Sequence, residues 1–100
     1  MSMLTPPEST QLAALCRRWK IRNLSLFGSR ARGEARPDSD VDLMVDYEPG
    51  ADWSLLDTVQ LRMELATLFG RPVDLVRDDD IANPYRRVSI RRDLRSLYAA

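Results

Sequence analysis

The chain has 100 residues with 15 basic and 15 acidic side chains, and 44% of its residues are apolar. This size and composition predict one folded domain over residues 1–100, and they argue against disorder or polyanion binding driven by net charge. The chain has no histidine and one cysteine, Cys16. These counts exclude Ser-His-Asp and Cys-His catalysis, histidine-ligated zinc and an internal disulfide.

The charges are segregated along the chain. Residues 1–37 carry seven basic and two acidic side chains. Residues 38–80 carry three basic and twelve acidic side chains, and residues 81–100 carry five basic side chains and one acidic side chain. An acidic middle between basic ends suits a metal site beside phosphate- or partner-binding arginines, although ordinary solvated charge accounts for most of these residues. No apolar run reaches the roughly 18 residues that cross a bilayer, and the first ten residues do not resemble a signal peptide. We therefore expect a cytoplasmic protein.

The first predicted element is a helix that opens at Thr5, with Pro6 in the first helical position and Glu8 placed for a capping box. Its apolar residues recur at helical spacing and form one face: Leu12, Leu15, Cys16 and Trp19. Because free cysteine is usually buried, we expect Cys16 to be a core residue and not a reactive thiol.

Two strands follow. Residues 21–27 read as a short strand that ends at Gly28-Ser29, and residues 29–39 read as a short helical turn and a loop. Residues 40–47 alternate strictly, with one face predicted to be Val41, Leu43, Val45 and Tyr47 and the other Asp40, Asp42, Met44 and Asp46. The turn residues 48–50 end that strand.

A second helix is predicted from about Trp53 to Phe69, capped by Asp52 or Ser54 and ended by Gly70. Its predicted buried stripe is Leu55, Leu56, Val59, Met63 and Ala66. A third strand follows at residues 72–76. The last predicted helix starts at Asn83-Pro84 and runs to about Tyr98, burying Ile90, Leu94, Leu97 and Tyr98. The order α-β-(short α)-β-α-β-α favours an α/β fold, but the pattern does not give the strand directions.

Three aspartates are the candidates for chemistry. Asp40 and Asp42 are two residues apart in a strand and therefore project from the same face, where two ionised carboxylates repel unless a cation or water offsets them. Mg²⁺ prefers carboxylate and phosphate oxygens, and Asp74 on another strand could complete a two-metal site and accept the nucleophile's proton. Alternatively, Asp40 caps a turn and Asp42 lies on the surface. A calcium loop fails, because its sixth position would be Leu43 and its twelfth Pro49.

Gly28-Ser29 is the second candidate feature. Glycine at a strand end lets the backbone approach a ligand closely, and serine can cap a helix whose free N–H groups bind an anion. The turn could therefore hold the outer phosphates of a nucleotide, although a plain strand-to-helix turn explains it equally well. It is not a Walker A loop, because GSRARG lacks the lysine and the spacing.

These residues together resemble a known family. The segments GSRARG at 28–33 and SDVDL at 39–43 match the nucleotidyltransferase signature G-S-x10-D-x-D, and RPVDLV at 71–76 is similar to the strand of the third aspartate. The chain thus resembles the minimal nucleotidyltransferases (MNT) of the DNA polymerase β-like superfamily. The resemblance implies the minimal nucleotidyltransferase fold, a small mixed sheet with helices packed on it. It implies nucleotide binding by Gly28 and Ser29, and two Mg²⁺ ions (or Mn²⁺) held by Asp40, Asp42 and Asp74. Arg30 follows that turn directly and is predicted to bind the nucleotide by neutralising its phosphates.

Small stand-alone members of that family resemble antitoxins of HEPN ribonuclease toxins. The resemblance therefore implies an enzyme that transfers AMP from ATP to a tyrosine of a HEPN-type toxin partner. The residues themselves predict no role for a membrane, and they do not favour nucleic acid as acceptor because no basic groove studded with aromatic residues is evident. Two alternatives stay open: an antitoxin that neutralises its partner by binding alone, and a small-molecule nucleotidyltransferase of the aminoglycoside type. The roles of Arg32, Arg36, Arg86 and Arg87 stay open as well.

Overall fold

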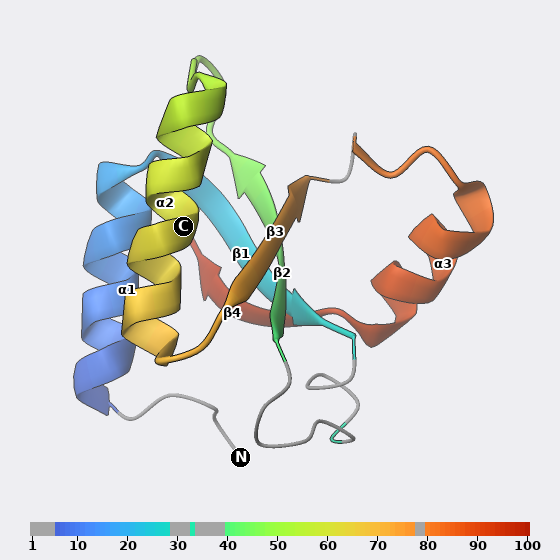
Figure 1. Ribbon diagram of the computed structural model, residues 1–100, viewed down its shortest axis with the longest axis horizontal. Helices are drawn as coiled ribbons and strands as arrows, with labels where there is room; N and C mark the ends of the chain where they lie inside the picture. The colour runs from blue at the N-terminus through green and yellow to red at the C-terminus, as the bar shows by residue number, and fades with distance from the viewer. Residues whose placement is uncertain (1–5, 29–32, 34–39, 78–79) are drawn as a thin grey trace.

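The computed structural model describes residues 6–28, 33, 40–77 and 80–100, and in these ranges it contains three helices and four strands (Figure 1). In chain order the elements are α1 (Pro6–Arg18), β1 (Ile21–Phe27), β2 (Val41–Tyr47), α2 (Leu55–Phe69), β3 (Val73–Arg77), α3 (Pro84–Asp93) and β4 (Arg95–Ala99). None of the helices in these ranges is long and apolar enough to span a bilayer.

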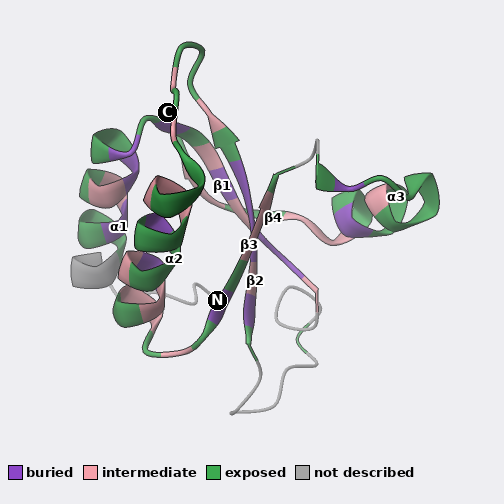
Figure 2. Cartoon of the chain, turned by 45° about the horizontal axis from the view of Figure 1, so that its top comes forward, coloured by how far each residue is buried: buried purple, intermediate pink, exposed green. Residues whose placement is uncertain are grey.

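The four strands form one mixed sheet in the order β3-β2-β1-β4. β1 pairs antiparallel with both β2 and β4, whereas β2 and β3, which α2 connects, run parallel. α1 and α2 lie side by side against one face of the sheet, and α3 lies on the other side (Figures 1 and 2). The predicted α/β class, a small mixed sheet with helices packed on it, is confirmed.

The main core lies between the sheet and the pair α1 and α2. The alternation predicted for residues 40–47 holds, because Val41, Leu43 and Val45 enter this core while Met44 is buried on the face of α3. Each fully buried side chain of this size contributes about 1.5–3 kcal/mol through the hydrophobic effect. At one end of the core, the rings of Trp19 and Trp53 meet edge to face with centroids 4.9 Å apart, and the Trp53 indole N–H donates to the Trp19 carbonyl oxygen at 2.8 Å.

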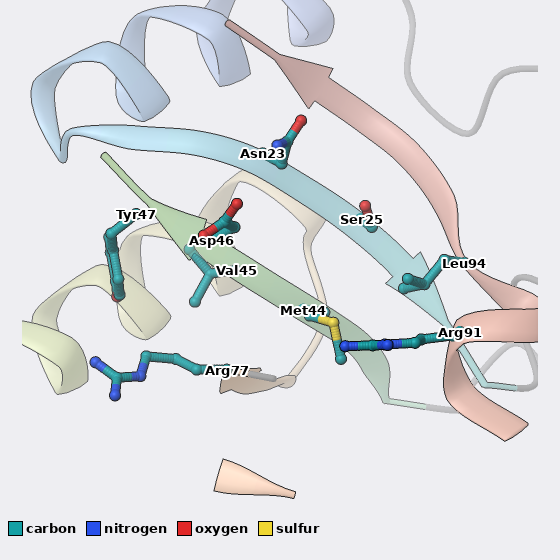
Figure 3. Close-up of a pocket in the computed structure, with 9 residues that line it drawn as sticks. All are labelled: Asn23, Ser25, Met44, Val45, Asp46, Tyr47, Arg77, Arg91 and Leu94. Carbon is teal, nitrogen blue, oxygen red and sulfur yellow. The ribbon is translucent and has the colours of Figure 1, made fainter. Parts of the chain in front are cut away.

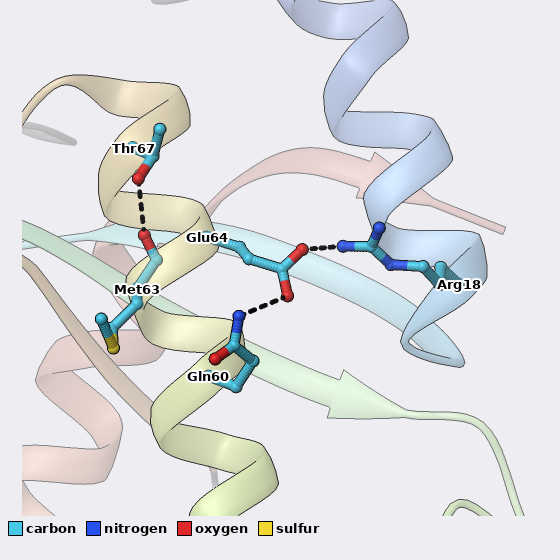
Figure 4. A network of polar contacts seen from close by, with 5 residues as sticks. All are labelled: Arg18, Gln60, Met63, Glu64 and Thr67. Carbon is cyan, nitrogen blue, oxygen red and sulfur yellow. Dashed lines mark hydrogen bonds and ion pairs between the residues drawn. The ribbon is translucent and has the colours of Figure 1, made fainter.

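Polar contacts connect α1 and α2 at the surface (Figure 4). Arg18 of α1 forms an ion pair with Glu64 of α2, whose other carboxylate oxygen accepts a hydrogen bond of 3.4 Å from the Gln60 amide. The Thr67 hydroxyl donates to the Met63 carbonyl oxygen at 3.1 Å within α2. Because solvent-exposed ion pairs contribute only about 0–1 kcal/mol, the apolar core and not this network holds the two helices against the sheet.

The predicted helix ends are largely confirmed. Ser54 caps α2 in a reciprocal box with Asp57: the Asp57 N–H donates to the Ser54 hydroxyl at 3.1 Å, and the Ser54 N–H donates to the Asp57 carboxylate at 2.9 Å. Gly70 ends α2 with a φ of 69°, in the left-handed region that favours glycine. Asn83 caps α3, with Pro84 in its first position. The predicted cap Thr5 lies outside the described residues, as does the predicted turn at 29–39 except for Gly33.

The predicted buried stripe of α2 is wrong. Leu55, Leu56 and Met63 are 81%, 80% and 59% exposed, Val59 is 36% exposed, and of the predicted stripe only Ala66 packs against the core. The fully buried residues of α2 are Leu61 and Leu65. α2 carries apolar residues around most of its circumference, so two stripes satisfy helical spacing, and only packing against the sheet decides which of them faces inward.

The predicted C-terminal helix is too long. α3 ends at Asp93, Leu94 adopts an extended conformation, and residues 95–99 form strand β4, which pairs with β1 through Leu26↔Arg95 and Ser25↔Ser96. The prediction failed because the strand partner lies some 70 positions earlier in the chain, where local spacing carries no signal. Ile90 is buried as predicted. Leu97 and Tyr98 pack against the main core from a strand and not from a helix.

Cys16 is fully buried in the main core, as predicted, and this burial raises the pKa of its thiol to about 12 from an ordinary value of 9.0, with Arg17 offsetting part of the effect. The pKa of the thiol is higher in the folded state than in the unfolded state. Below pH 9 the protonated thiol therefore contributes fully to the stability of the folded state. This contribution is lost as pH rises from 9 towards 12.

We therefore expect iodoacetamide at pH 8 to leave the native protein unlabelled and to label it fully in denaturant, because only an accessible thiolate reacts. Peptide mass spectrometry after both treatments measures this difference. Rapid labelling of the native protein would contradict the buried position of Cys16.

Candidate active site

The face of the sheet opposite α1 and α2 carries two of the predicted acidic residues side by side. Asp42 of β2 and Asp74 of β3 are direct register partners in the parallel pair. Neighbouring strands lie about 4.8 Å apart, and partner positions project to the same face. The fold thus brings together two carboxylates that lie far apart in sequence, as predicted. Asp42 is half-buried and Asp74 is exposed, so the pair is open to a ligand from solvent.

Gly28 lies against this pair at the end of β1. Its φ is 75°, and a Cβ built on it would lie 2.4 Å from Oδ2 of Asp42 and 3.3 Å from Cγ. Any other residue would therefore have to displace the Asp42 side chain and would also be strained in its backbone. The sequence suggested that this glycine makes room for a ligand. The structure adds that it makes room for the Asp42 carboxylate.

The remaining predicted site residues are placed less completely. Asp40 lies one residue before β2 and two before Asp42, with an exposed side chain. Ser29 and Arg30 lie outside the described residues, together with Arg32 and Arg36. Within residues 6–28, 33, 40–77 and 80–100, no three acidic, histidine or cysteine side chains gather closely enough to hold a metal ion.

The donor chemistry of the carboxylate pair fits a hard divalent cation. Asp42 and Asp74 offer carboxylate oxygens, which are the ligands Mg²⁺ prefers, and an Mg²⁺ ion usually completes its shell with water and substrate phosphates. Two neighbouring carboxylates repel each other when no cation lies between them. Binding of a divalent ion would relieve that repulsion, so the pair is suited to hold a metal once a nucleotide supplies further oxygens.

A pocket of about 560 Å³ lies further along β1 and β2, near the end of β3 and beside α3 (Figure 3). Met44, two residues beyond Asp42, lies on its floor, and Arg77 at the end of β3 and Arg91 of α3 line its sides. The other lining residues are Asn23, Ser25, Val45, Asp46, Tyr47 and Leu94. Its volume lies within the range of about 300–1,000 Å³ that is typical of small-molecule sites.

The sequence analysis did not predict this pocket. Asn23 and Ser25 occupy alternate positions of β1, so polar residues at those positions could have signalled an open face. The sequence could not show that Arg77 and Arg91 line one pocket, because this depends on how α3 packs against the sheet. Phe27, Met44, Ile81 and Ile90 form the small second core that fixes this packing.

Two charged residues that line the pocket, Asp46 and Arg77, have neighbours of opposite charge. Asp46 accepts hydrogen bonds of 2.7 and 3.1 Å from the guanidinium of Arg22, so its negative charge is balanced by an adjacent cation. Nε of Arg77 lies 3.9 Å from the Asp80 carboxylate, in a pair that is more than half exposed. Burial raises the pKa of Tyr47, and the charge of Arg77 offsets part of that rise. Asp46 and Arg77 therefore each have an oppositely charged neighbour.

Paired carboxylates beside a glycine turn, on a small mixed sheet, are the arrangement expected of an enzyme that transfers a phosphate-linked group. The comparison with protein families makes this specific, because the model of the nucleotidyltransferase domain matches residues 8–97. The chain belongs to the nucleotidyltransferase domain family, and it is a nucleotidyltransferase.

The chain is also similar to individual proteins that are named as nucleotidyltransferases or adenylyltransferases. The protein adenylyltransferase MntA of Thermococcus cleftensis is 36% identical over 96 residues, which cover 91% of this chain and 95% of that protein. A solved minimal nucleotidyltransferase is 38% identical with a TM-score of 0.71, and the match covers 89% of this chain and 88% of that one. The MNT antitoxin complexed with the tri-AMPylated HEPN toxin of Shewanella oneidensis shares the fold, with a TM-score of 0.63 at 20% identity over 94% of this chain and 71% of the matched chain.

Proposed function

We propose that this nucleotidyltransferase is a protein adenylyltransferase that acts as an antitoxin, transferring AMP from ATP to a tyrosine of a HEPN-type toxin. The observation that carries the proposal is the register that makes Asp42 and Asp74 neighbours beside Gly28. The similarity over nearly the whole chain to the adenylyltransferase MntA supports AMP as the transferred group. The likeness to an antitoxin complexed with an AMPylated HEPN toxin supports the class of acceptor.

In this proposal the turn at Gly28, Ser29 and Arg30 binds the outer phosphates of ATP. Asp40, Asp42 and Asp74 hold two divalent cations, Mg²⁺ or Mn²⁺. When bound, these cations neutralise the triphosphate and stabilise the charge that develops on the transferred phosphoryl group. Because Gly28 has no Cβ, its backbone can lie close to the Asp42 carboxylate.

The reaction forms a bond between the tyrosine hydroxyl oxygen and the α-phosphorus of ATP. The bond from the α-phosphorus to the oxygen that bridges to the β-phosphate breaks, and pyrophosphate leaves with the electron pair. Asp74 accepts the proton of the hydroxyl. It is suited to this role because it is exposed on the open face, at the strand beside Asp42.

The test combines the purified protein, ATP, Mg²⁺ and the HEPN-type protein encoded beside it. Intact-mass spectrometry should detect the mass of AMP added to the partner, and peptide mapping should place it on a tyrosine. Replacing Mg²⁺ with EDTA should stop the transfer. An unmodified partner after complete incubation would refute the proposal.

A double variant, Asp40→Asn with Asp42→Asn, separates transfer from neutralisation by binding alone. If neutralisation occurs by AMP transfer, a sub-stoichiometric amount of the wild-type protein should inactivate the toxin, whereas the same amount of the double variant should not. Equal neutralisation by the variant at sub-stoichiometric amounts would mean that the carboxylates are not needed.

A further inference from the structure

Tyr85 is the most exposed of the three tyrosines in this chain. It lies in the first turn of α3 and is 86% exposed. Tyr47 and Tyr98 both pack against the main core, and the hydroxyl oxygen of Tyr47 is buried. An acceptor hydroxyl has to come within about 3–3.5 Å of the phosphorus that it attacks. Tyr85 is therefore the tyrosine whose hydroxyl can enter an active site while the chain stays folded.

The first turn of α3 presents Tyr85 on an accessible part of the molecule. Residues 82–86 are all exposed, and α3 projects from the sheet on the side opposite α1 and α2 (Figures 1 and 2). The turn is held by Asn83, whose side-chain oxygen accepts hydrogen bonds from the backbone N–H groups of Tyr85 at 2.9 Å and Arg86 at 3.3 Å. Another protein molecule can therefore reach Tyr85 without displacing any part of the core.

The helix that carries Tyr85 is basic, whereas the segment that carries the candidate carboxylates is acidic. α3 contains four arginines and one aspartate, and three of these arginines are exposed: Arg86, Arg91 and Arg92. Residues 38–80, which contain β2 and β3, carry twelve acidic and three basic side chains. Opposite charges on two surfaces steer the encounter of the molecules that carry them. The α3 surface of one copy is therefore complementary in charge to the carboxylate strands of another copy.

We propose that this protein transfers AMP to Tyr85 of a second copy of itself, a reaction that we call self-transfer. The proposal rests on the proposed function, because it uses the same carboxylates and the same ATP. A second copy is required because Tyr85, at 86% exposed, contacts little of its own chain, so its hydroxyl does not lie against its own Asp42 and Asp74.

The self-transfer reaction forms a bond between the hydroxyl oxygen of Tyr85 and the α-phosphorus of the ATP held by the other copy. The bond from that phosphorus to the oxygen that bridges to the β-phosphate breaks, and pyrophosphate leaves with the electron pair. Asp74 of the copy that holds the ATP accepts the hydroxyl proton. The attached phosphate adds negative charge to α3 and weakens the attraction between copies, so we expect about one AMP group per chain.

Mixing two variants tests whether transfer occurs between copies. Asp42→Asn keeps Tyr85 but lacks a complete active site, whereas Tyr85→Phe keeps the active site but lacks the acceptor hydroxyl. Each variant alone, with ATP and Mg²⁺, should stay unmodified. In the mixture, intact-mass spectrometry should detect AMP only on the Asp42→Asn chain, and peptide mapping should place it on Tyr85. Tyr98→Phe is the matched control and should be labelled like the wild type.

An encounter between two copies also predicts how the rate depends on concentration and charge. Doubling the protein concentration should double the initial rate of labelling per chain. The Arg86→Gln, Arg92→Gln double variant should be labelled several-fold more slowly, whereas Arg17→Gln, which removes an exposed charge from α1, should match the wild type. A rate per chain that does not change with concentration would indicate transfer within one chain and would overturn the proposal.

A parallel assay with the HEPN-type toxin separates self-transfer from the proposed function. Tyr85→Phe should modify the toxin at the wild-type rate, because Tyr85 is not part of the active site. A modified toxin beside an unmodified Asp42→Asn chain in the mixture would overturn self-transfer and leave the proposed function intact. AMP on Tyr85 with none on the toxin would support self-transfer and refute the toxin as acceptor. If neither protein gains AMP, both proposals fail.

Discussion

Asp42→Asn should abolish AMP transfer while leaving the protein folded. Among the residues that the structure describes, Asp42 is the one that contacts both other parts of the site: Asp74 is its register partner, and Gly28 lies against its carboxylate. Asparagine keeps the shape of the side chain but offers one oxygen and no charge. Since cation-assisted stabilisation of a phosphoryl group is worth several kcal/mol, the transfer rate should fall roughly 10³-fold or more.

The folded state should tolerate this substitution, since asparagine removes one of two neighbouring like charges and no core residue. Single-turnover transfer measured by intact mass, together with thermal unfolding of the metal-free protein, tests both parts of the prediction. Asp52→Asn is the control, because Asp52 is an exposed acidic residue ahead of α2 and away from the carboxylate pair. A large drop in Tm for Asp42→Asn, or transfer within a few-fold of the wild-type rate, would contradict the role given to Asp42.

Gly28→Ala should reduce transfer about 100-fold, for a geometric reason. The new methyl carbon would lie 2.4 Å from Oδ2 of Asp42, closer than nonbonded atoms can approach, so the carboxylate has to move. A displacement of about 1 Å in a catalytic group can cost about 10² in rate. In addition, the φ of 75° would cost a non-glycine residue about 1–2 kcal/mol of stability.

Gly50→Ala separates the clash from the backbone strain. Gly50 has a φ of 87°, and a Cβ there would meet nothing within 4 Å. Both variants should therefore unfold at lower denaturant concentration by similar amounts, but only Gly28→Ala should lose transfer. If the two variants lost activity equally, global destabilisation and not the displacement of Asp42 would be the cause.

Sequence patterns predicted the features that depend on neighbouring residues. The strict alternation of residues 40–47 gave β2 and its two faces, and Ser54, Gly70 and Asn83 marked helix ends through local hydrogen bonds and backbone conformation. The i, i+2 spacing of Asp40 and Asp42, with Asp74 in a later short strand, gave the candidate carboxylates. The structure then placed Asp42 and Asp74 on adjacent strands.

Features that depend on distant contacts were missed or assigned wrongly. Residues 95–99 form a strand because the edge of β1 is available to pair with them, and this pairing leaves no local trace in the sequence. The choice between the two apolar stripes of α2 depends on the sheet beneath it, which is why Leu61 and Leu65 were overlooked. The pocket of Arg77 and Arg91 likewise depends on the packing of Ile90 against Phe27 and Met44.

The direct pairing of Asp42 with Asp74 has a consequence for how the chain can change in length. Val73 is buried on the helix side and Asp74 projects to the open side, so the two sides of β3 are assigned by odd and even positions. One residue inserted between Val73 and Asp74 would direct the carboxylate into the apolar interior, whereas two inserted residues would restore its direction one strand repeat further on. The site therefore requires Asp74 to keep an even spacing along β3. Inserting or deleting a single residue there should impair the site far more than a substitution of similar size.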